Sequence, residues 1–194
     1  MTVKNAVSPA AFEAKYRRSS DPWQFAASPY EQRRFATTLR SLTQPRYPRA
    51  FEPGCSVGVL TAALAERCDT LLACDIAPTA VRLARERCAG FLNVFIDQAD
   101  LAKSLPDGIF DLVVFSEVGY YFSAASLARI IRGLAKRLAR DGEFIAVHWR
   151  GDSRDHRLHG DDVHAILKST LHTRCTWLKG ERHREFRLDV WRRR

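Results

Sequence analysis

Two carboxylates flank a turn that contains two glycines, and their spacing indicates a nucleoside-binding site. Glu52 precedes Gly54 and Gly58, and Asp75 closes the segment. The separation of the two acids is near the roughly 20 residues at which a carboxylate meets a ribose hydroxyl. Because glycine has no Cβ atom, the backbone of such a turn can approach a ligand closely. These four residues could therefore hold a ligand that contains a ribose.

A strand, a helix and a second strand must position these residues. Residues 49–53 lead into the turn as a short apolar run, an alanine-rich helix follows Gly58, and residues 71–75 form the next apolar run. This order is typical of a βαβ unit, in which ligands bind outside the carboxyl ends of the strands. The alternative is a βαβ turn that binds no ligand, because a motif needs its structural context.

The turn differs from the dinucleotide-binding fingerprint, which would need glycine where Ser56 and Val59 stand. An acid two residues before the first glycine, as in Glu52-x-Gly54-x-Ser56-x-Gly58, instead resembles motif I of the class I S-adenosylmethionine-dependent methyltransferases. The resemblance implies S-adenosylmethionine as the cofactor.

Apolar runs alternate with helical patterns along the rest of the chain. Five strands that alternate with helices, followed by a closing pair, indicate an α/β fold with a doubly wound, Rossmann-like sheet. We expect seven mostly parallel strands with helices on both faces. Beyond the βαβ unit, strands are expected at residues 91–96, 110–115 and 143–149, and the closing pair at residues 173–178 and 185–191, with its turn at residues 179–181.

The chain is expected to form a single domain over residues 1–194, with an N-terminal helical lid at 1–48, a cofactor-binding core at 49–150 and a substrate-side helix with closing strands at 151–194. Ser8 and Ser28 each precede a proline, which is typical of a helix start, and Glu31 extends the second of these into a capping box.

Aromatic residues before the first strand suggest a cover over the cofactor. Trp23 and Tyr30 lie in this N-terminal segment, and an aromatic face attracts a sulfonium cation. Closure of such a lid also excludes water. The alternative is that these rings only anchor the segment on the core.

The chain resembles, more narrowly, the nodulation protein S family of methyltransferases. That family methylates the amine of a deacetylated amino-sugar oligosaccharide, so the resemblance implies a small-molecule acceptor, most simply an amine. The stretches that carry it are Asp21-Pro22-Trp23, Ser28-Pro29-Tyr30-Glu31-Gln32, Glu52-Pro53-Gly54-Cys55 and Ser116-Glu117-Val118-Gly119-Tyr120-Tyr121.

The methyltransferase resemblance also implies a division of the cofactor among successive strand exits. Glu52 is expected near the methionyl amine, Asp75 at the ribose hydroxyls, and Asp100 with the backbone of the next residue at the adenine edge. The full expected cofactor-binding set is Trp23, Tyr30, Glu52, Gly54, Cys55, Ser56, Gly58, Asp75, Ile76, Asp100, Leu101 and Ser116.

Glu117, Tyr120 and His148 are candidates for catalysis. Glu117 follows the most apolar strand and could accept the proton that leaves a methylated amine. Tyr120 and the adjacent Tyr121 would line the acceptor site, and His148 at the next strand exit is a second candidate base. The alternatives are a capping or supporting role for Glu117, packing for the tyrosines and a hydrogen-bonded core histidine at 148.

The formal charge of +9 raises nucleic acid as an alternative acceptor. The fourth strand exit lacks the Pro-Pro-aromatic motif of enzymes that methylate base amines, so nucleic acid is not favoured. Methylation of a small-molecule hydroxyl group is a further alternative. The chain is expected to act as a monomer or a homodimer.

No metal is expected, because the cluster of His156, His159 and His164 lacks partners at zinc-like spacing. The five cysteines contain no C-x-x-C pair and read as buried thiols of a reducing compartment, which predicts a cytoplasmic protein. The first residues show no apolar signal segment, and no run is long enough to span a membrane.

Overall fold

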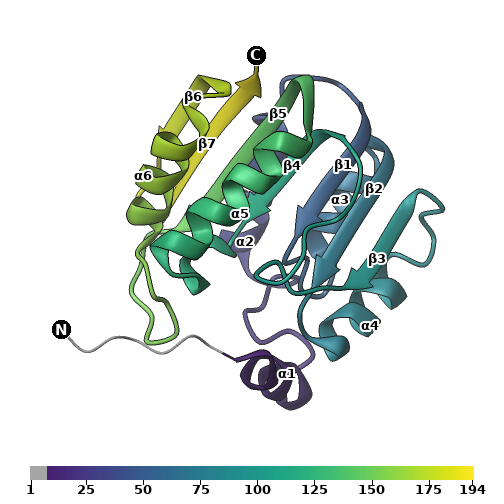
Figure 1. Ribbon diagram of the computed structural model, residues 1–194. Helices are drawn as coiled ribbons and strands as arrows, with labels where there is room; N and C mark the ends of the chain where they lie inside the picture. Colours follow the sequence, from purple (N-terminus) through teal and green to yellow (C-terminus); the bar gives the residue numbers. More distant parts are fainter. Residues whose placement is uncertain (1–7) are drawn as a thin grey trace. The chain divides into compact units, whose positions relative to one another are not determined.

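A computed structural model describes residues 8–194, which divide into two units, residues 8–100 and residues 101–194 (Figure 1). The first seven residues, where no signal segment is expected, lie outside the described part. Among residues 8–194, no helix is both long and apolar enough to cross a membrane.

The first unit begins with two helices that start as the sequence predicts. The Ser8 hydroxyl accepts the Ala11 N–H at 3.2 Å, and proline follows each capping serine, at a position where the missing N–H costs nothing. Ser28 caps the second helix, but the carboxylate of Glu31 binds the guanidinium of Arg34. The helices are α1 (Pro9–Arg18) and α2 (Pro29–Arg40).

Three parallel strands and two helices complete the first unit. The strands lie in the order β3-β2-β1, and both α3 and α4 pack on β2 (Figure 1). The elements are β1 (Tyr47–Pro53), α3 (Val59–Ala65), β2 (Cys68–Asp75), α4 (Pro78–Arg87) and β3 (Val94–Gln98).

The second unit contains four strands in the order β4-β5-β7-β6. The β4–β5 pair is parallel, and β7 runs antiparallel to both β5 and β6. The helices α5 and α6 pack side by side against these strands (Figure 1). The elements are β4 (Phe110–Ser116), the 3₁₀ turn η1 (Gly119–Tyr121), α5 (Ala124–Arg137), β5 (Leu138–Trp149), α6 (Gly160–Leu171), β6 (Cys175–Arg182) and β7 (Phe186–Arg193).

The predicted fold class is confirmed: the chain has the seven-stranded, mostly parallel sheet with flanking helices of a Rossmann-like fold. Buried residues, most of them aliphatic or aromatic, dominate the inner strands β1, β4 and β5, and every residue of β4 except Asp111 is buried. The carboxyl ends of β1, β2 and β4 are therefore fixed by well-packed strands.

Several predicted strand boundaries were wrong. The third strand was expected at 91–96 but covers Val94–Gln98, because Phe91 completes a turn in which its N–H bonds the Cys88 carbonyl at 2.9 Å. The fifth strand begins earlier than expected, at Leu138, because Leu138 already pairs with Phe110 of β4. A bulge follows, in which Asp141 has a φ of 61°, and regular pairing continues from Glu143.

The predicted turn of the closing pair was also wrong. Gly180 lies inside β6 rather than at a turn, and the chain reverses at residues 183–185. A Cβ at Gly180 would lie only 2.4 Å from Oδ1 of Asp189 on the paired strand. The glycine therefore leaves room for a buried carboxylate, which is a packing role that turn statistics do not reveal.

Candidate cofactor and acceptor sites

Glu52 is a buried carboxylate with unused hydrogen-bonding capacity. Only 3% of the residue is exposed, and its Oε2 has no hydrogen-bond partner. Burial raises the pKa of Glu52 to about 8, and the charge of Asp75 adds to the rise while the Thr61 hydroxyl opposes it. A cationic group of a ligand would supply the missing partner and favour the ionised carboxylate.

The turn after β1 has an unusual backbone that the strands hold in place. Gly54 and Gly58 have φ angles of 74° and 78°, and Ser56 adopts a left-handed φ of 51° without being glycine. The N–H groups of Gly54 and Cys55 both donate to the Cys74 carbonyl, at 2.7 and 2.9 Å. A left-handed non-glycine residue persists only where its surroundings hold it, and such residues cluster at functional sites.

Gly58 has a packing reason for being glycine. A Cβ there would lie 3.0 Å from the Cα of Ala84 on α4. Close approach of the turn to α4 therefore depends on this position. The side chain of Cys55 is also part of this packing, since it lies in a core cluster with Val81 and Ala84. Only the backbone of Cys55 can face a ligand.

Asp75 organises the loop that follows β2. Its Oδ2 accepts the Ser56 N–H and its Oδ1 accepts the Ala77 N–H, both at 3.0 Å. Burial raises the pKa of Asp75, and these backbone hydrogen bonds act against the rise. The residue thus joins the two strand exits of the βαβ unit, while Ile76 beside it is partly exposed.

The first N-terminal helix, α1, contacts this turn directly. The Tyr16 hydroxyl donates to the Ser56 Oγ at 2.7 Å in a buried contact, and Glu13 accepts the Thr79 N–H and hydroxyl at 3.0 and 2.7 Å. Trp23 packs on the same apolar cluster, with its ring 5.5 Å from that of Tyr16. Sequence reasoning named Trp23 but missed Tyr16, whose only signal was its place on the inner side of α1.

Other residues of the predicted set lie at loops and strand ends. Tyr30 is half-buried in the first turn of α2, and Asp100 is half-buried two residues after β3. In the second unit, Leu101 is buried in a turn and Ser116 is buried as the last residue of β4.

Glu117 is held at both oxygens by its own unit. Oε2 accepts the Tyr120 hydroxyl at 2.7 Å, and Oε1 accepts the Trp149 N–H at 2.6 Å. Its backbone has a left-handed φ of 57°, and its N–H donates to the Val147 carbonyl at 2.9 Å. The carboxylate is therefore fixed in orientation while the residue remains half-exposed.

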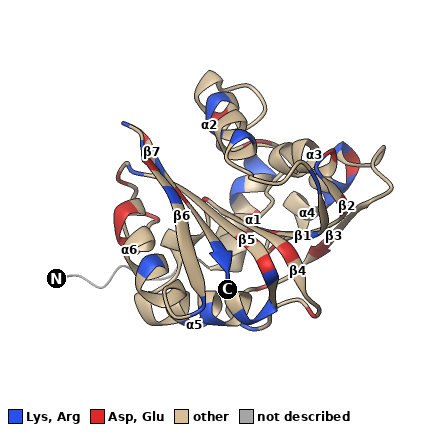
Figure 2. Cartoon of the chain, turned by 90° about the horizontal axis from the view of Figure 1, so that it is seen from above, with Lys and Arg blue, Asp and Glu red and all other residues tan. Residues whose placement is uncertain are grey.

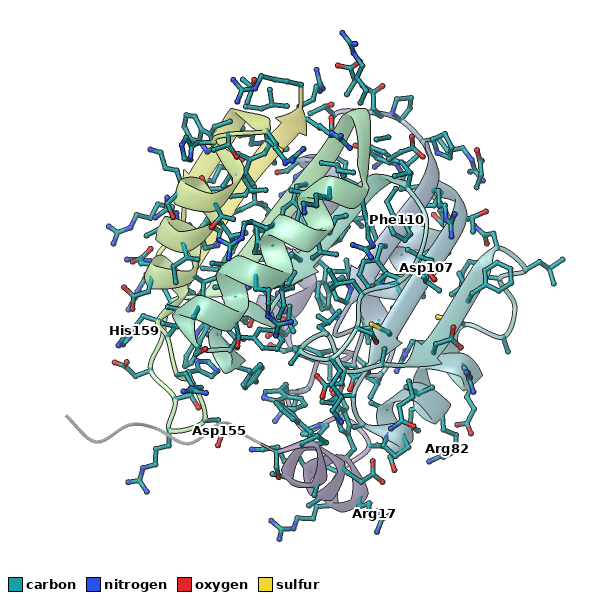
Figure 3. All side chains as sticks on the ribbon, in the orientation of Figure 1. Arg17, Arg82, Asp107, Phe110, Asp155 and His159 are labelled. Carbon is teal, nitrogen blue, oxygen red and sulfur yellow. The ribbon has the colours of Figure 1, made fainter. Side chains whose placement is uncertain are left out.

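Tyr120 lies between this carboxylate and the loop that follows β5. Its ring stacks on His156 with centroids 3.7 Å apart, and its carbonyl accepts the Arg157 N–H at 2.8 Å. Asp155 and His159, labelled in Figure 3, belong to the same loop of residues 150–159. The loop is thus fastened to Tyr120, while Tyr121 stays half-exposed.

His148 is fully buried, and both of its ring nitrogens have partners. Nε2 accepts the Gly119 N–H at 3.0 Å, and Nδ1 lies 3.2 Å from Nε2 of His164. A general base needs a free nitrogen within reach of the proton that it accepts. The geometry favours the core-histidine alternative for His148 and leaves Glu117 as the candidate base. Within residues 8–194, no group of three or more potential ligands could hold a metal ion.

The sequence and the fold of this chain are similar to those of known proteins. The family model of nodulation protein S (NodS) matches residues 12–174. The chain belongs to the nodulation protein S family. Nodulation protein S of Sinorhizobium fredii is 31% identical over 158 residues, which cover 79% of this chain and 73% of that protein.

Solved structures extend the likeness. A protein from Pseudomonas syringae that is inferred to be a methyltransferase is 43% identical, with a TM-score of 0.76, and the match covers 84% of this chain and 99% of that one. The N-methyltransferase NodS from Bradyrhizobium japonicum, in complex with S-adenosylhomocysteine, has a TM-score of 0.81 at 24% identity, over 93% of this chain and 97% of that one. The chain is an S-adenosylmethionine-dependent methyltransferase of this family.

Proposed function

We propose that the chain methylates the nitrogen of a small-molecule amine, with Glu117 as the residue that holds the amine and accepts its proton. The observation that carries this proposal is the doubly hydrogen-bonded, half-exposed carboxylate after β4. Family membership favours an amino-sugar oligosaccharide as the acceptor.

The first unit fits the cofactor. The buried, partnerless Oε2 of Glu52 suits the methionyl ammonium group, and the turn from Gly54 to Gly58 leaves room for the methionyl chain. Asp75 would bind the ribose hydroxyls, and Asp100 would meet the adenine. When bound, S-adenosylmethionine supplies a methyl group on a positively charged sulfur with a neutral thioether as its leaving group.

The residues of the second unit supply the rest of the chemistry. An amine must be neutral to attack, and it becomes cationic as the new N–C bond forms. Glu117 then accepts one proton from the nitrogen for each methyl group gained. The Tyr120 hydroxyl orients the carboxylate, and the half-exposed Tyr121 provides an apolar wall. Orientation of the two reactants supplies the remainder, since methyl transfer is a direct displacement.

A matched panel of acceptors tests this function. Cofactor with a deuterated methyl group is incubated with amino sugars and small amines, each paired with its N-acetylated form, and with hydroxyl compounds. We expect a single labelled methyl on free amines and none on the N-acetylated partners. Methylation of the hydroxyl compounds alone would overturn the proposal.

We propose that nucleic acid is not the acceptor. Lys and Arg occur on several elements, among them α2, α5 and β7, rather than on one alone (Figure 2). Exposed arginines such as Arg17 on α1 and Arg82 on α4 (Figure 3) pair with acids one turn away, Glu13 and Glu86. RNA binding should be weak and fall with salt, with a log–log slope of about −0.7 per neutralised phosphate. Tight binding at physiological salt would favour the nucleic-acid alternative.

The N-terminal segment, residues 8–48, is proposed to act as a lid over the cofactor. The Tyr16–Ser56 bond and the packing of Trp23 support this role. Hydrogen exchange at residues 20–35 should slow when S-adenosylhomocysteine, the product that the cofactor becomes after methyl transfer, is added. Unchanged exchange at saturation would leave the segment as an anchor only.

The remaining proposals concern setting and assembly. A reducing, cytoplasmic setting is supported by five buried cysteines without disulfide bonds. The chain is proposed to act as one domain and as a monomer or a homodimer, which sedimentation of the purified protein would distinguish.

A further inference from the structure

Three polar residues that the proposed chemistry does not use form a buried chain in the second unit. His148 comes from β5, His164 from α6 and Asp189 from β7, and none is more than 2% exposed. Nδ1 of His148 lies 3.2 Å from Nε2 of His164, and Nδ1 of His164 lies 2.6 Å from Oδ2 of Asp189. Buried polar groups without such partners would be costly.

At its His148 end, this series of hydrogen bonds reaches the backbone of the turn that carries Tyr120. The Gly119 N–H donates to Nε2 of His148 at 3.0 Å. A Cβ at Gly119 would lie 2.8 Å from that nitrogen and 2.5 Å from Cγ1 of Val163. The turn therefore rests directly on the histidine, and only glycine allows that approach.

The backbone donor fixes the position of every proton along the chain. Because a peptide N–H can only donate, Nε2 of His148 must accept, and a neutral His148 carries its proton on Nδ1. That proton donates to Nε2 of His164, whose own proton must then stand on Nδ1 and donate to Asp189. Both rings are neutral and both carry the proton on Nδ1.

The charge of Asp189 agrees with proton donation from His148 through His164 to this carboxylate. Burial lowers the pKa of His164, although the carboxylate of Asp189 acts in the opposite sense. Burial raises the pKa of Asp189, but hydrogen bonds from His164 and Trp177 outweigh it, so that the pKa lies below its ordinary value. Arg187 also donates to Oδ2 at 2.9 Å. An ionised Asp189 thus terminates a chain of neutral rings.

We infer that His148, His164 and Asp189 form a positioning relay that fixes the Gly119–Tyr121 turn and so holds Glu117 for methyl transfer. Tyr120 in that turn donates to one oxygen of Glu117, and Trp149, which follows His148 in β5, donates to the other. The left-handed backbone of Glu117 needs such external support. The relay rests on the proposed function of Glu117 as the residue that handles the acceptor.

Histidine nitrogen NMR of the unmodified full chain tests the proton positions without any acceptor. At pH 7, the rings of His148 and His164 should both be neutral with the proton on Nδ1. A charged ring, or a proton on Nε2 of either residue, would overturn the relay. This result stands even if no amine of the acceptor panel is methylated.

Two variants at one position test the positioning role. His164→Gln keeps an acceptor for the His148 proton, whereas His164→Leu fills the space without one. With saturating cofactor, the leucine variant should lose about tenfold to hundredfold in kcat, because small misplacements of catalytic groups cost that much. The glutamine variant should recover most of the loss, and both should keep the parent affinity for the cofactor product.

The opposite pattern would exclude the relay. A parent kcat in His164→Leu, or a glutamine variant no better than the leucine one, would leave the histidines as packing residues. If the leucine variant does not fold, the glutamine variant and the NMR measurement still decide. A kcat of the glutamine variant close to that of the parent, together with protons on Nδ1 of both histidines, supports the relay, whereas a kcat at least tenfold lower or a proton on Nε2 contradicts it.

Discussion

Glu52 in β1 and Glu117 after β4 are both carboxylates at the carboxyl end of a parallel strand, but they differ in burial and in hydrogen-bond partners. Glu52 is buried with one partnerless oxygen, and burial raises its pKa to about 8. Glu117 is half-exposed and accepts hydrogen bonds from Tyr120 and Trp149. The first carboxylate keeps an oxygen that a ligand could bind, whereas the second is oriented by hydrogen bonds within the protein.

This difference matches what each residue is proposed to do. A residue that binds a cation gains most when the protein leaves its charge uncompensated, because the ligand then supplies a partner that burial has made valuable. A residue that accepts a proton during a reaction gains most from a fixed position. The following predictions test both halves of this comparison.

The largest effect is expected at Glu117. Glu117→Gln keeps the shape of the side chain and removes its charge, so turnover of an amine should fall by roughly 10²–10⁴-fold, the usual loss for a general base. Affinity for the cofactor product should stay unchanged in calorimetry. A parent turnover rate across pH 6 to 9 would show that this carboxylate is not the base.

A smaller loss, in binding alone, is expected at Asp75. Asp75→Ala should weaken cofactor binding by roughly 1.5–3 kcal/mol, as the loss of charged hydrogen bonds does. Because Asp75 also holds the N–H groups of Ser56 and Ala77, the melting temperature without cofactor is the control. Unchanged affinity would remove Asp75 from the site.

The raised pKa of Glu52 should make the stability of the ligand-free protein depend on pH. Its raised pKa means that the protonated carboxyl stabilises the folded, ligand-free protein fully below its ordinary pKa of 4.5 and progressively less as the pH rises through about 8. The free energy of unfolding of the parent should therefore decrease over this window, and Glu52→Gln should remove that decrease.

Cofactor binding should ionise Glu52 and release part of a proton near pH 7. Calorimetry in two buffers with different ionisation enthalpies measures this release, and Glu52→Gln is the control for protons lost by the ligand itself. Equal proton release in the parent and in the variant would contradict a role for Glu52 at the methionyl amine.

The smallest effect is expected at Tyr16. Tyr16→Phe removes one buried hydrogen bond to Ser56, which should cost about 0.5–1.5 kcal/mol in cofactor affinity. Thr79→Val is a matched control, because it loosens α1 on α4 through Glu13 and leaves the Ser56 contact intact. An equal loss in both variants would show that α1 acts only as an anchor.

Local signals were enough to predict much of the fold. The serine caps, the glycine turn after β1 and the apolar run of β4 each depend on residues adjacent in the sequence, so the sequence predicted the elements that contain them. The boundaries of β5 and the closing hairpin were missed because cross-strand pairing decided them, and the start of β3 was missed because Phe91 lies in a turn before the strand. Gly180 is the clearest example, because the residue that requires glycine at this position, Asp189, lies on the opposite strand.

The site was predictable to a similar extent. Glu52, Asp75 and Glu117 follow from the positions of the strand ends, although their contacts with ligand are still predictions. The partners that set their behaviour come from distant parts of the sequence, as Tyr16 does for Ser56 and Asp189 does for His164. One signal was available, because an aspartate inside the apolar run of β7 indicates a buried partner.

The most direct test of the comparison measures two quantities on two variants: affinity for the cofactor product, and kcat for the best amine at saturating cofactor. Glu52→Gln should lower the affinity and leave kcat near that of the parent, whereas Glu117→Gln should leave the affinity unchanged and lower kcat. If Glu52→Gln instead lowers kcat at full saturation while Glu117→Gln weakens cofactor binding, the assignment of the two carboxylates is wrong.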